Sequence, residues 1–279
     1  MKPLISVVSA SWNQGRYLAE CHQSILDVGV GLVEHIVIDN CSDDETHKVL
    51  ARYPEIDAVI ESDRGQSDAL NKGFQRARGE WILWLNVDDY LLPGVMAKLL
   101  ELIRYRGEEV DMFYGHTVFV DGESQKIRTV YHPRWFYWMT QIGCYAAPST
   151  GSLFRRTLLV ENPLDEDFHM IMDTEWMLRV GKTLRVKRLN LRTVSFRLDD
   201  NKTADHIQSG LITPQHQKER DKLGLKYSAY HEGADAETTP SDRFVLRVCR
   251  RLTRLWILSD KFVSKYILVR RDKAKQLSQ

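Results

Sequence analysis

Two adjacent carboxylates, Asp88 and Asp89, directly follow an apolar run over residues 81–85. Asn86 stands two residues before Asp88, so the segment NVDD places three oxygen-bearing side chains at one point of the chain. Such oxygens suit a hard cation, Mg²⁺ or Mn²⁺, which proteins bind through one or two carboxylates plus phosphate oxygens of a substrate. An acidic turn beside the next helix is the simpler interpretation, and the pair alone does not decide between the two.

The elements around this segment favour the cation site. Apolar, β-branched runs predict strands, and the stretches between them have helical periodicity. We expect strands over residues 4–10, 33–39, 56–61 and 81–85, and helices over residues 17–27, 46–53, 66–78 and 94–104. This alternation predicts an α/β fold with a mostly parallel sheet flanked by helices. Ligands bind at the carboxyl ends of such strands, where SASWNQ, DNCSDD, SDRGQSD and NVDD all stand.

Local signals suggest where two of these helices begin and end. Ser42 followed by Glu45 predicts a capping box before the helix over residues 46–53. Gly79 is expected at the C′ position after the helix over residues 66–78.

The chain beyond residue 105 is less regular. We expect strands over residues 111–120, 126–131 and 193–198, and a helix that contains residues 173–180. The aromatic segment 135–145 either lines a sugar-binding surface or packs in the core. The segment EGADAETTP at residues 232–240 predicts a hinge between a domain over residues 1–231 and a tail over residues 241–279.

The tail is strongly basic. It holds 11 Lys and Arg against 3 Asp and Glu, a charge of +8, whereas the preceding residues carry −7. Its apolar residues recur at helical spacing with Arg between them, which predicts a basic amphipathic helix. Such a helix either binds an anionic membrane surface or packs on the domain with a solvated basic face. Its apolar face argues against a nucleic-acid partner.

The composition, 43% hydrophobic and 28% charged, is typical of a globular protein. The four cysteines form no CxxC pair, which argues against a disulfide scaffold or a structural zinc site. The first residues lack the apolar core of a signal peptide. We therefore expect a cytoplasmic protein, either free or peripheral on the inner face of the cell membrane. Neither a GxGxxG nor a P-loop motif is present.

Three stretches resemble the nucleotide-binding half of family 2 glycosyltransferases in order and spacing: SVVSASWNQGRYLAECHQSIL, EHIVIDNCSDDET and ESDRGQSDALNKGFQRARGEWILWLNVDDYLLPG. The likeness covers residues 4–105 closely and residues 145–205 more loosely. It implies the GT-A fold, with residues 1–105 as the nucleotide-binding half and residues 106–231 as the acceptor half.

The resemblance assigns nucleotide-sugar contacts to side chains at the strand ends. It implies that Asn86-Val87-Asp88 stands for the family's DxD motif, with Asn in place of the first Asp. Asp88 would then hold the Mn²⁺ or Mg²⁺ that bridges the diphosphate, with Asp89 as a secondary ligand. The other implied contacts are made to the base by Ala10 and Trp12, to the base or ribose by Asp39, and near the base and phosphates by Asp63 and Arg64.

A second acidic segment supplies the implied catalytic base. Residues 172–179, MDTEWMLR, resemble the family's ED-x-x-L-x-x-R helix start, with Met172 in place of the Glu. Asp173 matches the carboxylate that deprotonates the acceptor hydroxyl in the family. A later segment, FRLDDNKT, is similar to a family loop that often carries a His; Asp199 stands there and is a further candidate metal ligand.

The sequence therefore predicts a metal-dependent, inverting glycosyltransferase. It would move a sugar from a nucleotide-diphosphate donor, expected to be UDP-linked, to a hydroxyl of a glycan or lipid-linked acceptor in cell-surface polysaccharide synthesis. Two alternatives stay open. A sugar nucleotidyltransferase would have a similar sheet but needs a Gly-rich, Arg-containing loop that is missing here. A catalytically weak or inactive nucleotide-sugar-binding protein is supported by Asn86 and Met172, which stand where the family motifs have acidic residues.

Overall fold

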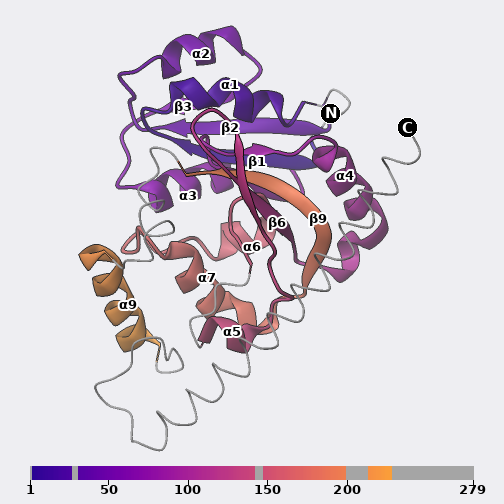
Figure 1. Ribbon diagram of the computed structural model, residues 1–279, viewed down its shortest axis with the longest axis vertical. Coiled ribbons are helices and arrows are strands. Elements are labelled where there is room, and N and C mark those ends of the chain that lie inside the picture. Colours follow the sequence, from indigo (N-terminus) through magenta and orange to yellow (C-terminus); the bar gives the residue numbers. More distant parts are fainter. Residues whose placement is uncertain (1, 27–30, 142–146, 199–212, 228–279) are drawn as a thin grey trace, which may run out of the picture.

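The first half of the chain forms the predicted alternation of strands and helices (Figure 1). The computed structural model describes residues 2–26, 31–141, 147–198 and 213–227. Four parallel strands lie in the order β3-β2-β1-β4. These strands are β1 (Ile5–Ser11), β2 (Val33–Asp39), β3 (Asp57–Ile60) and β4 (Trp81–Trp84). The helices that follow them are α1 (Gly15–Gln23), α2 (Thr46–Arg52), α3 (Gln66–Arg76) and α4 (Val95–Arg106).

The second half extends the same sheet with mixed strand directions. β8 runs antiparallel to β4 and to β6, β6 runs parallel to β9, and β7 forms a hairpin with β6. β9 is longer than the predicted strand over residues 193–198 and curves beside β6 (Figure 1). The strands of this half are β5 (Tyr90–Leu91), β6 (Met112–Val120), β7 (Lys126–Val130), β8 (Ser152–Arg155) and β9 (Val186–Arg197).

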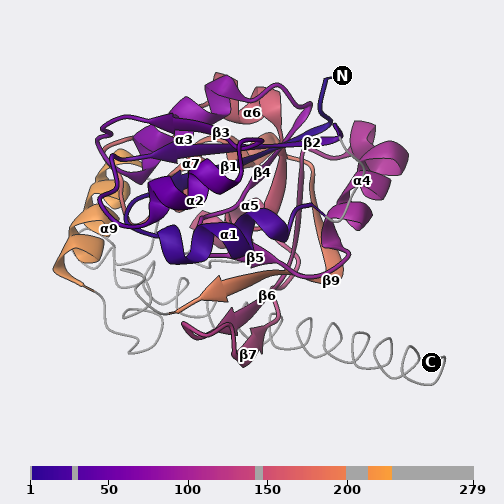
Figure 2. The same ribbon diagram turned by 90° about the horizontal axis from the view of Figure 1, so that it is seen from above.

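Helices cover both faces of the sheet, as predicted (Figure 2). Successive strand residues point to opposite faces, so Val8 packs in one hydrophobic cluster with α3 and α7, and Val7 packs in another with α4. The helices of the second half are α5 (Tyr137–Gln141), α6 (Arg156–Glu161), α7 (Met172–Val180) and α9 (Pro214–Lys226), with 3-10 turns at Gly107–Glu109 and Gly181–Thr183. The chain is thus an α/β protein whose strand ends carry the candidate residues.

Both predicted helix-boundary signals are wrong. The residue that precedes α2 is Glu45, and the Ser42 hydroxyl instead donates to Asp39 (2.6 Å) and accepts from the Asn13 amide (2.8 Å). Gly79 has no left-handed backbone; it is small because a Cβ there would lie 2.6 Å from the Ser6 nitrogen. Local sequence signals failed at these positions because a neighbouring strand or loop uses the same residues.

Several predictions concern residues outside the described ranges. The hinge at residues 232–240, the tail at residues 241–279 and the loop that contains Asp199 are among them. Within the described residues, no helix has both the length and the apolar character needed to cross a bilayer.

Candidate active site

The carboxyl ends of β1, β2 and β4 meet at one edge of the sheet, because these strands are parallel and in register. Ser11 pairs with Asp39, and Val8 pairs with Trp84. The residues after these strands therefore gather at one rim, as the sequence predicted. Trp12 stands at this rim with 54% of its surface exposed, and Ala10 is half-buried beside it. An exposed indole offers a flat apolar face to a planar ligand.

Asp39 is the last residue of β2, and its carboxylate holds the loop that follows this strand. Its carboxylate is fully buried and accepts hydrogen bonds from the amide (2.9 Å) and hydroxyl of Ser42. His47 Nε2 lies 3.3 Å from the same carboxylate. Because Ser42 also binds Asn13, the loops after β1 and β2 are tied together. Asp39 thus organises the loops on which the predicted base and ribose contacts depend.

The loop after β3 presents Asp63 and Arg64. The Asp63 amide donates to Asn40 (2.9 Å), the Asp63 carboxylate accepts from Gly65 (2.8 Å), and partial burial raises the pKa of Asp63. The Arg64 side chain is 73% exposed and pairs with Asp68 (3.3 Å) and Glu166 (2.5 Å). An exposed guanidinium at a strand end is well placed for a phosphate group.

The NVDD segment turns sharply at the end of β4. The Asn86 side-chain oxygen accepts from Gln66 Nε2 and Trp84 Nε1, both at 3.1 Å. Those two donors occupy the amide oxygen that the sequence offered as a cation ligand. Val87 is fully buried in the core, which fixes the turn between the two polar positions.

Asp88 and Asp89 have different surroundings. Asp88 is 5% exposed, and Asp89 is 1% exposed. Asp89 accepts from the Thr150 hydroxyl (2.7 Å) and from the Arg197 amide (3.0 Å), so both of its oxygens are bonded within the protein. Burial, together with the neighbouring charge of Asp88, raises the pKa of Asp89. These contacts favour a supporting role for Asp89 and leave Asp88 as the better candidate ligand.

Arg197, which the sequence interpretation did not single out, lies directly behind this turn. Its side chain is 1% exposed, and its Nε donates to the Asp88 carbonyl oxygen (3.0 Å). The guanidinium also lies over the Tyr17 ring, 4.2 Å from the centroid. Its remaining acceptors are Asp121 O (2.9 Å), Gly122 O (2.9 Å), Glu20 Oε2 (2.6 Å) and Ser124 Oγ (3.1 Å). An arginine at a strand end is ordinarily a solvated residue, so the sequence carried no signal for this contact.

Asp173 lies in the first turn of α7, where the helix dipole stabilises a negative charge. Its carboxylate accepts from the Thr174 amide (2.7 Å) and from the Ser149 hydroxyl (3.0 Å). Met172, at the position of the family's Glu, is buried in the hydrophobic core. Asp173 is half-buried.

The Ser149-Thr150 turn joins the two acidic segments. Ser149 bonds Asp173, and its neighbour Thr150 bonds Asp89 (2.7 Å). The turn thereby brings the candidate base and the NVDD segment to the same place, although they are far apart in sequence. This connection could not be predicted from the sequence, because a Pro-Ser-Thr turn has no distinctive pattern.

The described residues include no group of three His, Cys, Asp or Glu side chains arranged to hold a metal ion. Within the NVDD segment, Asp88 remains the candidate ligand, because the carboxylate of Asp89 and the amide oxygen of Asn86 accept hydrogen bonds within the protein. This donor set fits a Mg²⁺-type ion that takes most of its ligands from a diphosphate and water. Asp199, the further candidate, lies outside the described residues.

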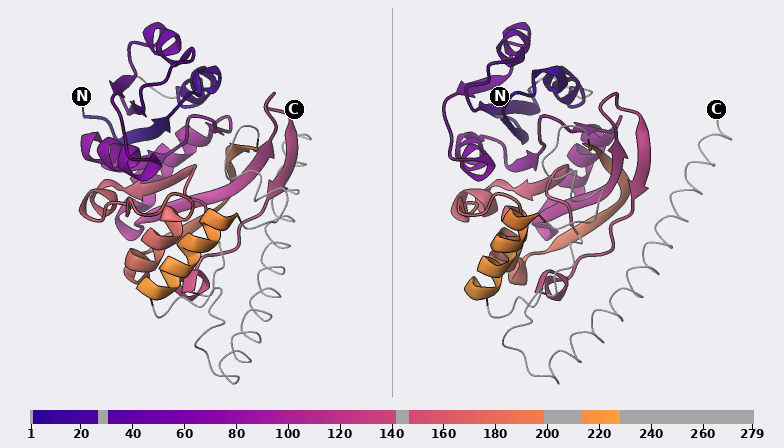
Figure 3. Two further views of the ribbon diagram at one scale, coloured as in Figure 1. Left: turned by 90° about the vertical axis from the view of Figure 1, so that its left-hand side faces the viewer. Right: turned by 60° about the vertical axis from the view of Figure 1, so that its left-hand side comes forward.

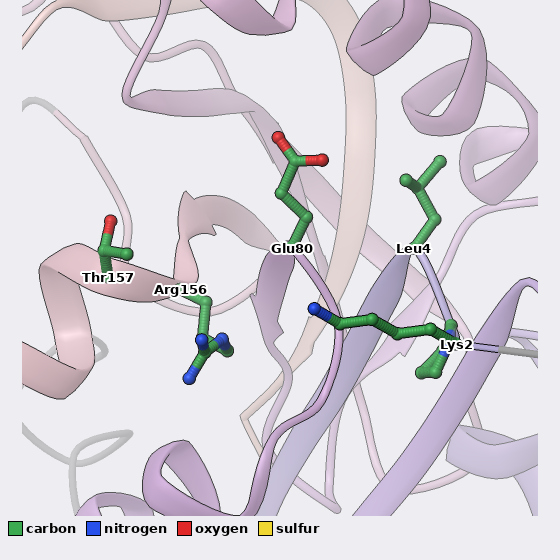
Figure 4. Close-up of a pocket in the computed structure, with 6 residues that line it drawn as sticks. Lys2, Leu4, Glu80, Arg156 and Thr157 are labelled. Carbon is green, nitrogen blue, oxygen red and sulfur yellow. The ribbon is translucent and has the colours of Figure 1, made fainter.

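A separate hollow lies at the opposite edge of the sheet, near the amino ends of β1 and β4 (Figure 4). It is lined by Lys2, Pro3, Leu4, Glu80, Arg156 and Thr157. None of the predicted site residues lines it. The rim at the carboxyl ends of the strands therefore remains the candidate site.

A parallel half-sheet with an acidic rim, extended by mixed strands that carry a second acidic helix start, defines a GT-A-type nucleotide-sugar transferase fold. Solved structures share this fold. S. aureus TarS 1-349 in complex with UDP-GlcNAc matches with a TM-score of 0.59 and 16% identity, covering 80% of this chain and 66% of TarS 1-349. Mannosyltransferase PcManGT from Pyrobaculum calidifontis, in complex with GDP-Man and Mn²⁺, matches with a TM-score of 0.54 and 16% identity, covering 96% of this chain and 87% of PcManGT.

The profile of Glycosyl transferase family 2 matches residues 6–180, and the chain belongs to this family. TuaG of Bacillus subtilis, named as a teichuronic acid biosynthesis glycosyltransferase, is 34% identical over 110 residues, which are 38% of this chain and 44% of TuaG. The succinoglycan biosynthesis protein ExoO of Rhizobium meliloti is 28% identical over 128 residues, 45% of this chain and 37% of ExoO. The chain thus spans less than half the length of these two relatives. The uncharacterized glycosyltransferase YwdF of Bacillus subtilis is 28% identical over 233 residues, 80% of this chain and 84% of YwdF.

Proposed function

We propose that the protein is an inverting glycosyltransferase that moves a sugar from a nucleotide-diphosphate donor, preferably UDP-linked, to a hydroxyl of a growing polysaccharide. One observation carries the proposal: Ser149 and Thr150 connect Asp173 to the NVDD segment, so the proposed base adjoins the proposed diphosphate site. The relatives named for teichuronic acid and succinoglycan biosynthesis support a polysaccharide acceptor. The nucleotide-sugar complexes of TarS and PcManGT support a donor of this class.

The donor would lie along the strand ends. Trp12 and Ala10 would contact the base, and the loops organised by Asp39 and Asp63 would hold the ribose. Arg64 would approach the phosphates. Asp88 would hold a Mn²⁺ or Mg²⁺ ion, which, when bound, neutralises the charge that develops on the departing diphosphate.

Asp173 would act as the general base. Its carboxylate takes the proton of the acceptor hydroxyl as the hydroxyl oxygen forms its bond to the anomeric carbon. The bond from that carbon to the diphosphate oxygen breaks with its electron pair, so the nucleoside diphosphate leaves and the anomeric configuration inverts. The hydrogen bonds from the Ser149 hydroxyl to Oδ2 and from the Thr174 amide to Oδ1 hold the Asp173 carboxylate in one orientation.

The test is transfer and hydrolysis measured over a panel of nucleotide sugars with Mn²⁺, Mg²⁺ or EDTA, in the wild type and in Asp173→Asn. We expect EDTA to abolish activity, and Asp173→Asn to lower kcat by at least about 100-fold with donor affinity nearly unchanged. Glu101→Gln is the matched control, because this exposed carboxylate lies on α4 and pairs with Lys98 (2.6 Å). Absence of turnover with every donor and metal would remove the enzyme assignment and favour a binding protein. A loss of donor binding in Asp173→Asn would show that Asp173 is not the base.

We also propose that the acceptor is lipid-linked and that the basic tail, residues 241–279, holds the enzyme on the cytoplasmic face of an anionic membrane. Each Lys or Arg near such a surface contributes about 1 kcal/mol of binding. Flotation of the full chain with anionic vesicles should therefore decrease in a variant with Arg250, Arg251 and Arg254 changed to Gln. Equal flotation of both proteins would argue for a tail that packs on the domain.

A further inference from the structure

Helix α9 lies beyond the region that matches the family profile, yet it packs beside α7 (Figure 3). It begins with a regular cap: the Thr213 hydroxyl accepts from the His216 amide (3.2 Å), and Pro214 follows at the first position. The helix is therefore a defined element, and its contacts with the start of α7 bear on the candidate base.

Glu219 contacts the backbone just before that base. Its side chain is buried, and its two carboxylate oxygens accept from three consecutive backbone amides. These bonds join Oε1 to His169 N (3.1 Å) and Oε2 to Met170 N (2.8 Å) and Ile171 N (3.2 Å). Charge-assisted bonds of this kind are about twice as strong as neutral ones. Ile171 is the residue that precedes the first turn of α7. Glu219 thus fixes the backbone two residues before Asp173.

The rest of α9, with the residue that follows it, also contacts α7 and the loop before α7. Leu223 is fully buried in the main hydrophobic cluster. Lys226 and Tyr227 bond the fully buried carboxylate of Glu175 at 2.9 Å and 2.6 Å. Lys222 and Lys226 pair with Asp167 and Asp165. These attachments prevent α9 from moving away as Glu219 bonds the loop.

The loop over residues 164–171 also contacts the nucleotide-binding half. The Ser67 hydroxyl donates to the Phe168 carbonyl oxygen (2.9 Å), and Asn71 forms two hydrogen bonds with Leu164. At Gly65, a Cβ would lie 2.9 Å from the His169 ring, so the loop touches the turn after Asp63 and Arg64. The loop is therefore held between α3 and α9, and its position relates the donor loop to the start of α7.

We propose that Glu219 is a positioning residue for catalysis: its carboxylate sets the position of the first turn of α7 and thereby aims Asp173 at the acceptor hydroxyl. The inference rests on the proposed function, because it takes Asp173 as the base. A shift of about 1 Å in a reacting group lowers a rate by as much as 100-fold. The donor side chains lie on other elements, and Arg64, which pairs with Glu166 of this loop, also pairs with Asp68 on α3.

The kinetic test is Glu219→Gln in the full chain. Glutamine fills the same space but offers a single acceptor oxygen to three N–H donors. We expect kcat to fall about 10- to 100-fold, with the donor dissociation constant changed less than twofold. The matched control is Asp221→Asn, a neutralised carboxylate on the exposed side of the same helix. The proposal is overturned if kcat in Glu219→Gln equals that of the control, or if donor affinity falls in step with kcat.

Hydrogen exchange supplies a measurement that does not depend on activity. In Glu219→Gln, the amides of residues 169–173 should exchange at least about tenfold faster, as for loss of about 1.4 kcal/mol of protection, whereas β4 should not change. If Glu219→Gln does not fold, Glu219→Asp takes its place with the same expectation, because the shorter side chain cannot reach all three amides. Unchanged exchange overturns the positioning role. Faster exchange in a protein with no transferase activity would instead count against the proposed function alone.

Discussion

The substitution Arg197→Lys keeps the positive charge behind the NVDD turn but removes some of the hydrogen bonds that support the turn. The arginine donates to five acceptors, which are Asp88 O, Asp121 O, Gly122 O, Glu20 Oε2 and Ser124 Oγ. A lysine keeps the positive charge but has only three donors, all on one atom. At least two of these acceptors therefore lose their partner. An unpaired buried group costs about 1–3 kcal/mol, and most of these acceptors are only partly buried, so we expect a loss of about 1–3 kcal/mol in the free energy of unfolding.

The assay is urea unfolding, with Arg185→Lys as the matched control. Arg185 also forms a fork with a carboxylate, at 3.0 Å and 2.6 Å from Asp111, but its side chain is 53% exposed. Exposed pairs contribute about 1 kcal/mol or less, so the control should unfold close to the wild type. We also expect Arg197→Lys to weaken metal-dependent donor binding about tenfold, or about 1.4 kcal/mol, because the Asp88 backbone loses its anchor. Equal unfolding free energies for the two variants would refute this account of Arg197.

Two further predictions concern stability. His35 is buried between Ser9 and His22, and burial, followed by the nearby His22 charge, lowers its pKa to about 3. Below the ordinary histidine pKa of about 6.5, His35 takes up a proton in the unfolded chain but not in the folded protein. The free energy of unfolding should therefore decrease as the pH falls, by about 2 kcal/mol between pH 6.5 and pH 5. His35→Gln should lose this part of the slope in urea titrations at the two pH values, and an equal slope in both proteins would contradict it. Gly151 has φ +71° and a Cβ there would lie 2.4 Å from Val194, whereas Gly94 has φ +74° and open space. Gly94→Ala should therefore lower the free energy of unfolding by only about 1 kcal/mol, and Gly151→Ala by about 2–4 kcal/mol. Equal decreases in melting temperature for the two variants would show that the Val194 side chain moves aside.

The sequence predicted the parallel half of the fold well because its signals are local. The predicted bounds of β2 match the observed ones, and each end of β1, β3 and β4 lies within one residue of its predicted position. Apolar runs with short polar links leave few other arrangements, and parallel strands bring their carboxyl ends together without further information. The gathering of Trp12, Asp39, Asp63 and Asp88 at one rim follows from that topology.

The second half of the fold was harder to predict, because its strand order depends on contacts between distant parts of the chain. Its strands join the sheet in the order β4-β8-β6-β9-β5, which does not follow the chain. The first part of β9 was not predicted, because charged residues of the segment 186–192 break the period-two pattern. Helix α9 has a strongly polar sequence, and its buried Glu219 and Leu223 are few among charged neighbours.

What the sequence determined by itself was the set of acids and the strands that carry them: NVDD at the end of β4 and Asp173 at a helix start. What only the tertiary structure decided was how those acids are used. It directed both oxygens of Asp89 into the protein, placed Arg197 behind Asp88, and joined Asp173 to the rim through Ser149 and Thr150. The physical reason is the sequence separation over which each kind of interaction acts. Periodicity and caps act over a few residues, whereas a buried hydrogen bond between residues 108 positions apart depends on the whole packed sheet.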